Sequence, residues 1–287
     1  MRGGGDSAEN IDHAPAGADD PVRLQRAQGV GRLATQVTGT KTRIKELFQD
    51  GCAKIRLPAT HSDRLDAILI NTAGGLTGGD TLRWQVLAAP GSHLSLTTQA
   101  CERVYKSTGA DAAIETHLDI GENAHVDWLP QETILFEQSR LNRRLEADLA
   151  PGASLTAIEV VLLGREAMGE TARSALLNDN WLIRRNGKLI HAEANRLSAN
   201  DLERDALSLL AGNNAFATLI HIAEDADRHL EQVRAVLPSD ARAAASAIGE
   251  RLVVRVLAPS GLALRRLVTP ILECLVSTRQ LPKIWTT

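Results

Sequence analysis

A turn that recurs roughly every thirty residues constrains the fold of this chain more than any other feature. Gly91, Gly121 and Gly152 each lie in such a turn, between two short strand-like runs, in VLAAPGSHLSL, HLDIGENAHVDW and ADLAPGASLTAI. A short β unit that returns at this period is typical of stacked β coils, because each coil is too thin to bury its own face. A β-sandwich built from similar hairpins produces the same pattern and remains an alternative.

Apolar and polar residues alternate through much of the chain from Val30 to about Leu197, for example in Leu94–Thr97 and Leu155–Ile158. Alternation with a period of two is typical of half-buried strands. No amphipathic helix of three turns is evident before residue 200, so a doubly wound α/β fold is not expected. We therefore expect a mainly β protein with a stacked-sheet, β-solenoid-like body.

The character of the chain changes after residue 200. Strands are expected over Ala217–Ile222 and Arg251–Ala258, and helices over Asp227–Leu237 and Ser260–Thr278. Ser260 is the candidate N-cap of the second helix, in which Pro270 should cause a kink. We expect three parts: a disordered tail at 1–21, a β-rich body at 22–200, and a small α/β region with two helices at 201–287.

Composition excludes several classes of function. The net charge of −3 over 287 residues argues against nucleic acid as the main partner, which would favour a basic face. No apolar run approaches the ~20 residues that span a bilayer, and the N-terminus lacks the apolar region of a secretory signal. The three cysteines lie far apart, which suits a reducing cytosol. We expect a cytoplasmic protein that binds neither nucleic acid nor membranes.

The stretch NTAGGLTGGD, from Asn71 to Asp80, carries four glycines between two strand-like runs. Paired glycines indicate a sharply folded connection with close backbone approach. A phosphate-binding loop is not expected, because neither G-x-x-x-x-G-K-[ST] nor G-x-G-x-x-G is present. The segment is therefore interpreted first as a tight turn.

Acidic residues inside apolar β runs are the main candidates for chemistry. Glu159 lies in LTAIEVVLLG and Glu193 in KLIHAEANRL, while Asp80 closes the glycine-rich turn. Glu102 and Glu132 follow Gly91 and Gly121 at the same offset, so stacked coils would place them one above the other. Adjacent carboxylates repel each other unless a cation or a proton lies between them. The alternative is that each acid faces solvent or makes a structural hydrogen bond.

Other chemistries have little support. Carboxylates with scattered imidazoles, such as His125 and His191, would bind a divalent transition metal only loosely. No G-x-S-x-G motif is present, and nothing fixes the separation of a glycosidase-like acid pair. Arg103, Arg165 and Arg173 could contact anions or form surface ion pairs.

Several segments of the chain resemble one known family. These segments are NTAGGLTGGD (71–80), LTTQACERVYKS (96–107), VDWLPQETILFEQSRL (126–141), GREAMGE (164–170) and LPKIW (281–285). In order and spacing they resemble the urease accessory proteins of the UreD family, also called UreH, from about residue 22 to the end.

The resemblance implies a non-enzymatic scaffold with a β-rich, stacked fold and a small helical region. It implies a complex with UreF and the GTPase UreG that docks on apo-urease and installs its nickel. It also implies a channel for that nickel, with no tightly bound cofactor.

Our hypothesis is that Asp80, Glu102, Glu159 and Glu193 line a transient nickel path, with Glu132 as a weaker candidate. Charged ligands would lower the cost of moving a partly dehydrated ion through protein. Two alternatives remain: a β-solenoid enzyme acting on polysaccharide, and a binding module with no metal role.

Overall fold

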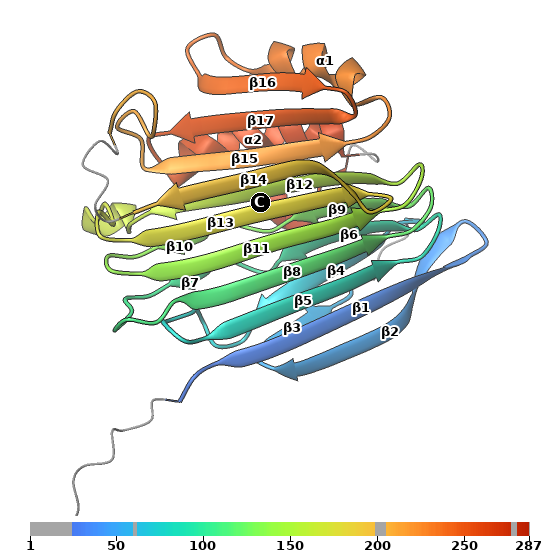
Figure 1. Ribbon diagram of the computed structural model, residues 1–287, viewed down its shortest axis with the longest axis horizontal. Helices are drawn as coiled ribbons and strands as arrows, with labels where there is room; N and C mark the ends of the chain where they lie inside the picture. Colours follow the sequence, from blue (N-terminus) through green and yellow to red (C-terminus); the bar gives the residue numbers. More distant parts are fainter. Residues whose placement is uncertain (1–24, 60–61, 199–204, 277–279, 287) are drawn as a thin grey trace, which may run out of the picture.

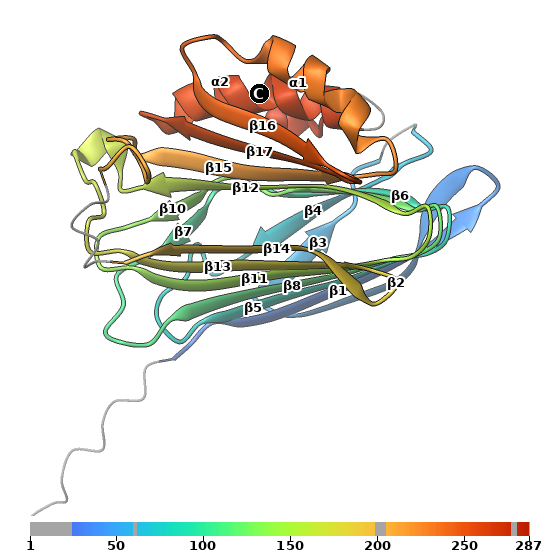
Figure 2. The same ribbon diagram turned by 45° about the horizontal axis from the view of Figure 1, so that its top comes forward.

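The computed structural model describes residues 25–59, 62–198, 205–276 and 280–286. Within these ranges the chain is mostly β-strand, arranged as two sheets that face each other (Figures 1 and 2). The tail expected at 1–21 lies outside the described residues. The expectation of a mainly β, solenoid-like fold is confirmed.

Sheet A has seven strands in the order β14-β13-β11-β8-β5-β1-β2. Its strands are β1 (Gln28–Thr38), β2 (Lys41–Gly51), β5 (Thr81–Ala88), β8 (Ala112–Ile120), β11 (Arg140–Leu149), β13 (Leu176–Arg185) and β14 (Lys188–Leu197).

Sheet B has ten strands, eight of them in the order β16-β17-β15-β12-β9-β6-β4-β3, with β10 pairing to β12 and β7 to β10. Its strands are β3 (Ala53–Arg56), β4 (Leu65–Asn71), β6 (His93–Thr98), β7 (Glu102–Val104), β9 (His125–Leu129), β10 (Thr133–Leu135), β12 (Ser154–Leu163), β15 (Ala215–Ile222), β16 (Arg242–Ile248) and β17 (Arg251–Ala258).

From β4 to β13 the chain winds back and forth between the two sheets. Successive turns of this winding add β5, β8, β11 and β13 to sheet A in parallel. They add β4, β6, β9 and β12 to sheet B, again in parallel. A sandwich of hairpins would make neighbouring strands antiparallel, so this parallel pairing identifies stacked coils.

The recurring glycine turns stack on one another at one end of the coils. The Gly91 amide donates to the carbonyl oxygen of Glu122 at 2.8 Å, and the Asn123 amide donates to that of Pro151 at 3.1 Å. Gly91 and Gly152 have φ values of +69° and +67°, which side-chain-bearing residues rarely adopt. Each turn therefore forms hydrogen bonds with the turn of the next coil.

The stacking register corrects one expectation. Between β7 and β10, Glu102 pairs with Thr133 and not with Glu132. Because successive side chains of a strand point to opposite faces, Glu102 and Glu132 lie on different sides of sheet B. The expected alignment of Glu102 with Glu132 is wrong by one residue, because the strand register places Thr133 opposite Glu102.

The strands beyond residue 200 continue sheet B, since β15 pairs with β12 and β17 pairs with β15. Two α-helices, α1 (Leu230–Val236) and α2 (Gly261–Leu275), cover the outer face of this end of the sheet (Figure 2). Three short 3-10 helices, η1 (Glu166–Met168), η2 (Ala226–His229) and η3 (Lys283–Trp285), complete the described elements.

The second helix begins as expected, with the Ala263 amide donating to Ser260 Oγ at 3.2 Å. It continues through Pro270 and ends at Leu275, earlier than the expected end at 278, because Val276 already has an extended backbone. No helix in the described ranges is long and apolar enough to cross a bilayer.

The apolar core has two parts. The larger part fills the space between the sheets, and the smaller part lies between sheet B and the two helices. The closing segment belongs to the second part: Trp285 is 2 % exposed, and its Nε1 donates to the Leu129 carbonyl oxygen at 2.9 Å. The end of the chain thus packs on the β body.

This packing predicts that two alanine substitutions in the C-terminal region lower the free energy of unfolding by different amounts. Trp285→Ala should lower the free energy of unfolding by about 3–5 kcal/mol, because it opens a cavity beneath α2. Leu262→Ala, at a position 62 % exposed on the same helix, should change it by less than about 0.5 kcal/mol. Urea denaturation of both variants measures the difference, and equal costs would contradict the packing.

Candidate functional site

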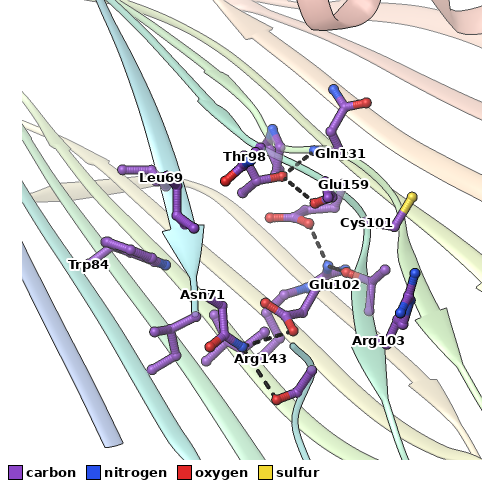
Figure 3. Close-up of a pocket in the computed structure, with 18 of the residues that line it drawn as sticks. Leu69, Asn71, Trp84, Thr98, Cys101, Glu102, Arg103, Gln131, Arg143 and Glu159 are labelled. Carbon is purple, nitrogen blue, oxygen red and sulfur yellow. Dashed lines mark hydrogen bonds and ion pairs between the residues drawn. The ribbon is translucent and has the colours of Figure 1, made fainter. Parts of the chain in front are cut away.

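A cavity of about 210 Å³ lies between the inner faces of the two sheets (Figure 3). Leu82, Ile114 and Arg143 line it from sheet A. Its other lining residues include Leu69, Asn71, Gly75, Thr98, Glu102, Trp128, Thr133 and Glu159. The structure thus brings two of the five candidate acids, Glu102 and Glu159, into one cavity.

Glu102 lies at one end of the cavity, where its side chain faces Asn71 (Figure 3). Asn71 Nδ2 donates to Glu102 Oε1 at 3.0 Å. Burial raises the pKa of the Glu102 carboxyl to about 7, although the hydrogen bond from Asn71 opposes this shift. A carboxyl that titrates near neutral pH can exchange a proton for a cation.

The glycine-rich segment packs against β7 and so positions this end of the cavity. The Leu76 amide donates to the Arg103 carbonyl oxygen at 2.7 Å, and the Tyr105 amide donates to that of Leu76 at 2.7 Å. A Cβ on Gly75 would lie 2.8 Å from the Arg103 carbonyl oxygen, so glycine is required for this approach. The interpretation as a tight turn is confirmed.

Asp80 closes that turn and lies away from the cavity lining. Its Oδ1 accepts the Ala27 amide at 2.8 Å, and its Oδ2 accepts the Thr77 amide at 2.7 Å. The side chain is buried and both oxygens are occupied by backbone donors. Asp80 therefore has a clear architectural role in this structure.

Glu159 belongs to a buried charged triad with Arg143 and Asp179. The Arg143 guanidinium binds Glu159 Oε2 through Nη1, and it binds Asp179 through Nε at 3.0 Å and Nη2 at 2.7 Å. Trp128 Nε1 donates to Glu159 Oε1 at 2.9 Å. One buried guanidinium thus faces two buried carboxylates.

Burial raises the pKa of the Glu159 carboxyl, and the neighbouring charge of Asp179 adds to this shift. The Arg143 charge and the Trp128 hydrogen bond oppose it. When both acids are ionised, the triad carries one excess negative charge. Such a site favours a proton or a metal cation.

A line of polar residues, here called the polar seam, continues from the triad across the interior. On sheet B, Thr218 pairs with Glu159, and Arg255 pairs with Thr218. On sheet A, Asn195 pairs with Asp179, and its Nδ2 donates to Thr218 Oγ1 at 3.5 Å. The polar seam therefore crosses from one sheet to the other.

Glu193 lies at the far end of the polar seam, on β14. Arg255 Nη2 donates to both of its carboxylate oxygens, at 2.7 and 2.6 Å. The imidazole of His191 lies beside it, with Nε2 3.8 Å from Glu193 Oε2. Both residues line a second cavity of about 380 Å³ between β14 and the strands β16 and β17. Glu193 and the first cavity thus lie at opposite ends of the seam.

Glu132 lies on the other face of sheet B, against α2. Arg265 Nη1 donates to its Oε1 at 3.0 Å, and Cys101 Sγ lies 3.3 Å from its Oε2. Burial and the Glu132 charge raise the pKa of the Cys101 thiol to about 11. The structure does not bring Glu132 together with the other acids.

The remaining candidates have other partners. His125 contacts Ser154 and Asp127 on the face of sheet B opposite the cavity. Arg165 forms a surface ion pair with Glu170, and Arg173 forms one with Asp205. Of the two roles considered for these arginines, anion contact and surface ion pairing, the structure shows the second.

Arg143 and Asp179 were not among the site residues expected from the sequence. Both occupy inward-facing positions between apolar inward residues, in Leu141-x-Arg143-x-Leu145 and Leu177-x-Asp179-x-Trp181. The period-two pattern could have identified them as charged groups on an apolar face.

Comparisons with known proteins agree with this fold. A family profile described as "UreD urease accessory protein" matches residues 27–286. The chain belongs to this family. A relative from Chelativorans sp. named "Urease accessory protein UreD" is 56 % identical over 265 residues, covering 92 % of this chain and 96 % of its own.

Other members have similar names and coverage. "Urease accessory protein UreD" of Rhizobium etli is 47 % identical over 92 % of this chain and 97 % of its own. The protein of the same name from Agrobacterium fabrum is 47 % identical over 93 % and 94 %. The chain is therefore a urease accessory protein, and it supports urease maturation.

The raised pKa of Glu102 predicts a pH-dependent stability. The folded protein holds the Glu102 proton more tightly than the unfolded chain does, so the contribution of Glu102 to stability should fall as pH rises from about 4.5 to 7. Glu102→Gln removes this titration and keeps an acceptor for Asn71. The stability of the variant relative to wild type should rise by on the order of 1–3 kcal/mol between pH 5 and pH 8. Urea denaturation at both pH values tests this, and a constant difference would contradict it.

The hydrogen bonds of Asp80 predict a structural defect for Asp80→Asn. The amide group retains one acceptor and directs an N–H group at a backbone amide, which should cost about 1–3 kcal/mol of stability. Thermal unfolding monitored by circular dichroism measures this loss. A variant as stable as wild type would show that the turn does not depend on both oxygens.

Proposed function

We propose that this protein is a non-enzymatic scaffold that delivers Ni²⁺ to apo-urease, in a cytoplasmic complex with UreF and the GTPase UreG. Family membership supports the role in urease maturation. The observation that supports a metal route is that two carboxyls, the partly buried Glu102 and the buried Glu159, line one interior cavity. Nickel is the cargo of this route and not a resident cofactor.

The proposed route enters beside Asn71 and Glu102, reaches the triad at Glu159, and follows the polar seam to Glu193. Carboxylate oxygens compensate part of the cost of removing water from the ion. Oxygen ligands hold Ni²⁺ less firmly than thiolate or clustered imidazole ligands do. Loose binding suits transfer better than storage.

Arg143 sets a condition on this route, because a guanidinium and Ni²⁺ compete for the same oxygens. Asp179 holds Arg143 through two hydrogen bonds, whereas Glu159 receives one. Transfer therefore requires Glu159 to release Arg143 to Asp179 and Thr133 while it binds the ion. Because the triad has two carboxylates for one guanidinium, releasing Glu159 from Arg143 costs less than breaking an ion pair of one carboxylate and one guanidinium would.

Asp80 and Glu132 have no place in the proposed route. Each carboxylate oxygen of Asp80 already accepts a hydrogen bond from a backbone amide, and Glu132 faces α2 on the other side of sheet B. Their effects on urease activation should follow from stability and docking.

A polysaccharide-active enzyme is the weaker alternative. Glu102 and Glu159 share a cavity, as an acid pair would, but about 210 Å³ lies below the ~300 Å³ at which ligand pockets begin. A polymer chain does not fit between the sheets at this site.

Matched glutamine substitutions test the proposed route. Glu102→Gln and Glu159→Gln keep the side-chain shape and an acceptor for Asn71 and Trp128. Each should reduce the nickel content of activated urease several-fold, because the route loses a charged ligand. Glu115→Gln, on the outer face of sheet A, should leave nickel content unchanged. The measurement is metal analysis of urease after activation by the complete complex.

Two controls make the result decisive. Co-purification with UreF and UreG must show that the complex is intact, and circular dichroism must show that each variant is folded. Full nickel content with both interior variants in an intact complex would refute the carboxylate route and leave the scaffold role standing.

A further inference from the structure

Three potential metal ligands converge on the outer face of sheet A, away from the interior cavity. Strands β8 and β11 run parallel there, and the register places Asp119 directly opposite Asp148. His117 lies two residues before Asp119 on the same strand, so both side chains point to the same face. The sheet register thus brings one imidazole and two carboxylates together.

The distances between these groups are short. His117 Nε2 lies 3.1 Å from Asp119 Oδ1 and 3.7 Å from Asp148 Oδ2. One ligand atom from each of the three residues lies within 4.8 Å of the other two. Glu146 approaches the other ring nitrogen, with its Oε2 3.7 Å from His117 Nδ1. The Nε2 atom can therefore face a metal while Glu146 orients the ring, as a second carboxylate often does for metal-bound histidine.

The charges on this face give an independent reason for a cation. Elsewhere on the face the acids are paired with arginine, as in Arg83–Glu115 and Arg144–Glu146. Within the part of the chain that the structure describes, neither Asp119 nor Asp148 makes an ion pair with lysine or arginine. Like charges directly opposite each other on adjacent strands are destabilising. A divalent cation would remove this repulsion.

We propose that His117, Asp119 and Asp148 form a surface binding site for a divalent first-row transition-metal ion, such as Ni²⁺ or Zn²⁺. Imidazole favours these ions over Mg²⁺ and Ca²⁺, which prefer oxygen ligands throughout. The three side chains are 37 %, 50 % and 39 % exposed, so water completes the coordination and the ion exchanges readily. The site holds its ion outside the protein body.

This site does not depend on the proposed interior route. Arg143 points into the core, whereas its neighbours Asn142 and Arg144 are exposed on the outer face that carries His117. Sheet A therefore separates the two places. The surface site could bind a metal whether or not any ion crosses the interior.

Equilibrium dialysis of the full-length protein against NiCl₂ at neutral pH tests this proposal. The wild-type protein should bind one more Ni²⁺ per chain than the double variant His117→Ala/Asp148→Asn, or bind that ion at least tenfold more tightly. Glu115→Gln, two residues before His117 on the same face, should bind like wild type. Glu102→Gln should also retain the surface ion, which distinguishes this site from the interior route.

A second measurement covers the possibility that the double variant folds poorly. Asp119→Asn alone relieves the charge repulsion, so it should be as stable as wild type without metal and gain less thermal stability when Ni²⁺ is added. Unchanged Ni²⁺ stoichiometry and affinity in both the double variant and Asp119→Asn would overturn the proposal. Loss of the bound ion in the Glu115→Gln control to the same extent would overturn it as well.

Discussion

Parallel stacking of coils that alternate between two facing sheets is the constraint on which the rest of this structure depends. Each coil contributes one strand to sheet A and one or two strands to sheet B, so residues at matching positions form rows across the interior. Most rows are apolar and build the core. A charged residue in an inward row cannot reach water, and it must find its partner within that row or across the gap.

The row of Arg143 and Asp179 on sheet A faces Glu159 and Thr218 on sheet B, and it resolves this constraint with hydrogen bonds between the sheets. Buried charged networks are weak sources of stability, because desolvation offsets much of their attraction. Here the network is also unbalanced, with two carboxylates for one guanidinium. Stability alone would favour a neutral or apolar row, and a proton or a cation would compensate the excess negative charge. Burial raises the pKa of both Glu102 and Glu159, and the charge of Asp179 adds to the shift only at Glu159.

Much of the fold could be predicted because it depends on local patterns. Alternation identified the β body, the recurring glycine turns indicated stacked coils, and Ser260 marked the start of α2. The candidate site was predicted less well. Glu102 and Glu159 do share a cavity, but Asp80 closes a turn and Glu132 faces a helix. Glu132 was misplaced because a one-residue change in register moves a side chain to the opposite face.

The sequence by itself determined the strand-rich body, the sharp turn at the glycine pairs and the family, because these depend on short-range periodicity and on motifs of adjacent residues. Only the tertiary structure decided which charges meet. Arg143 and Asp179 are 36 residues apart, and His117 and Asp148 lie on different coils, so their proximity depends on coil length and strand register. Register arises from the sum of many packing contacts and turn lengths across the sheets, and no local segment of the chain contains that information.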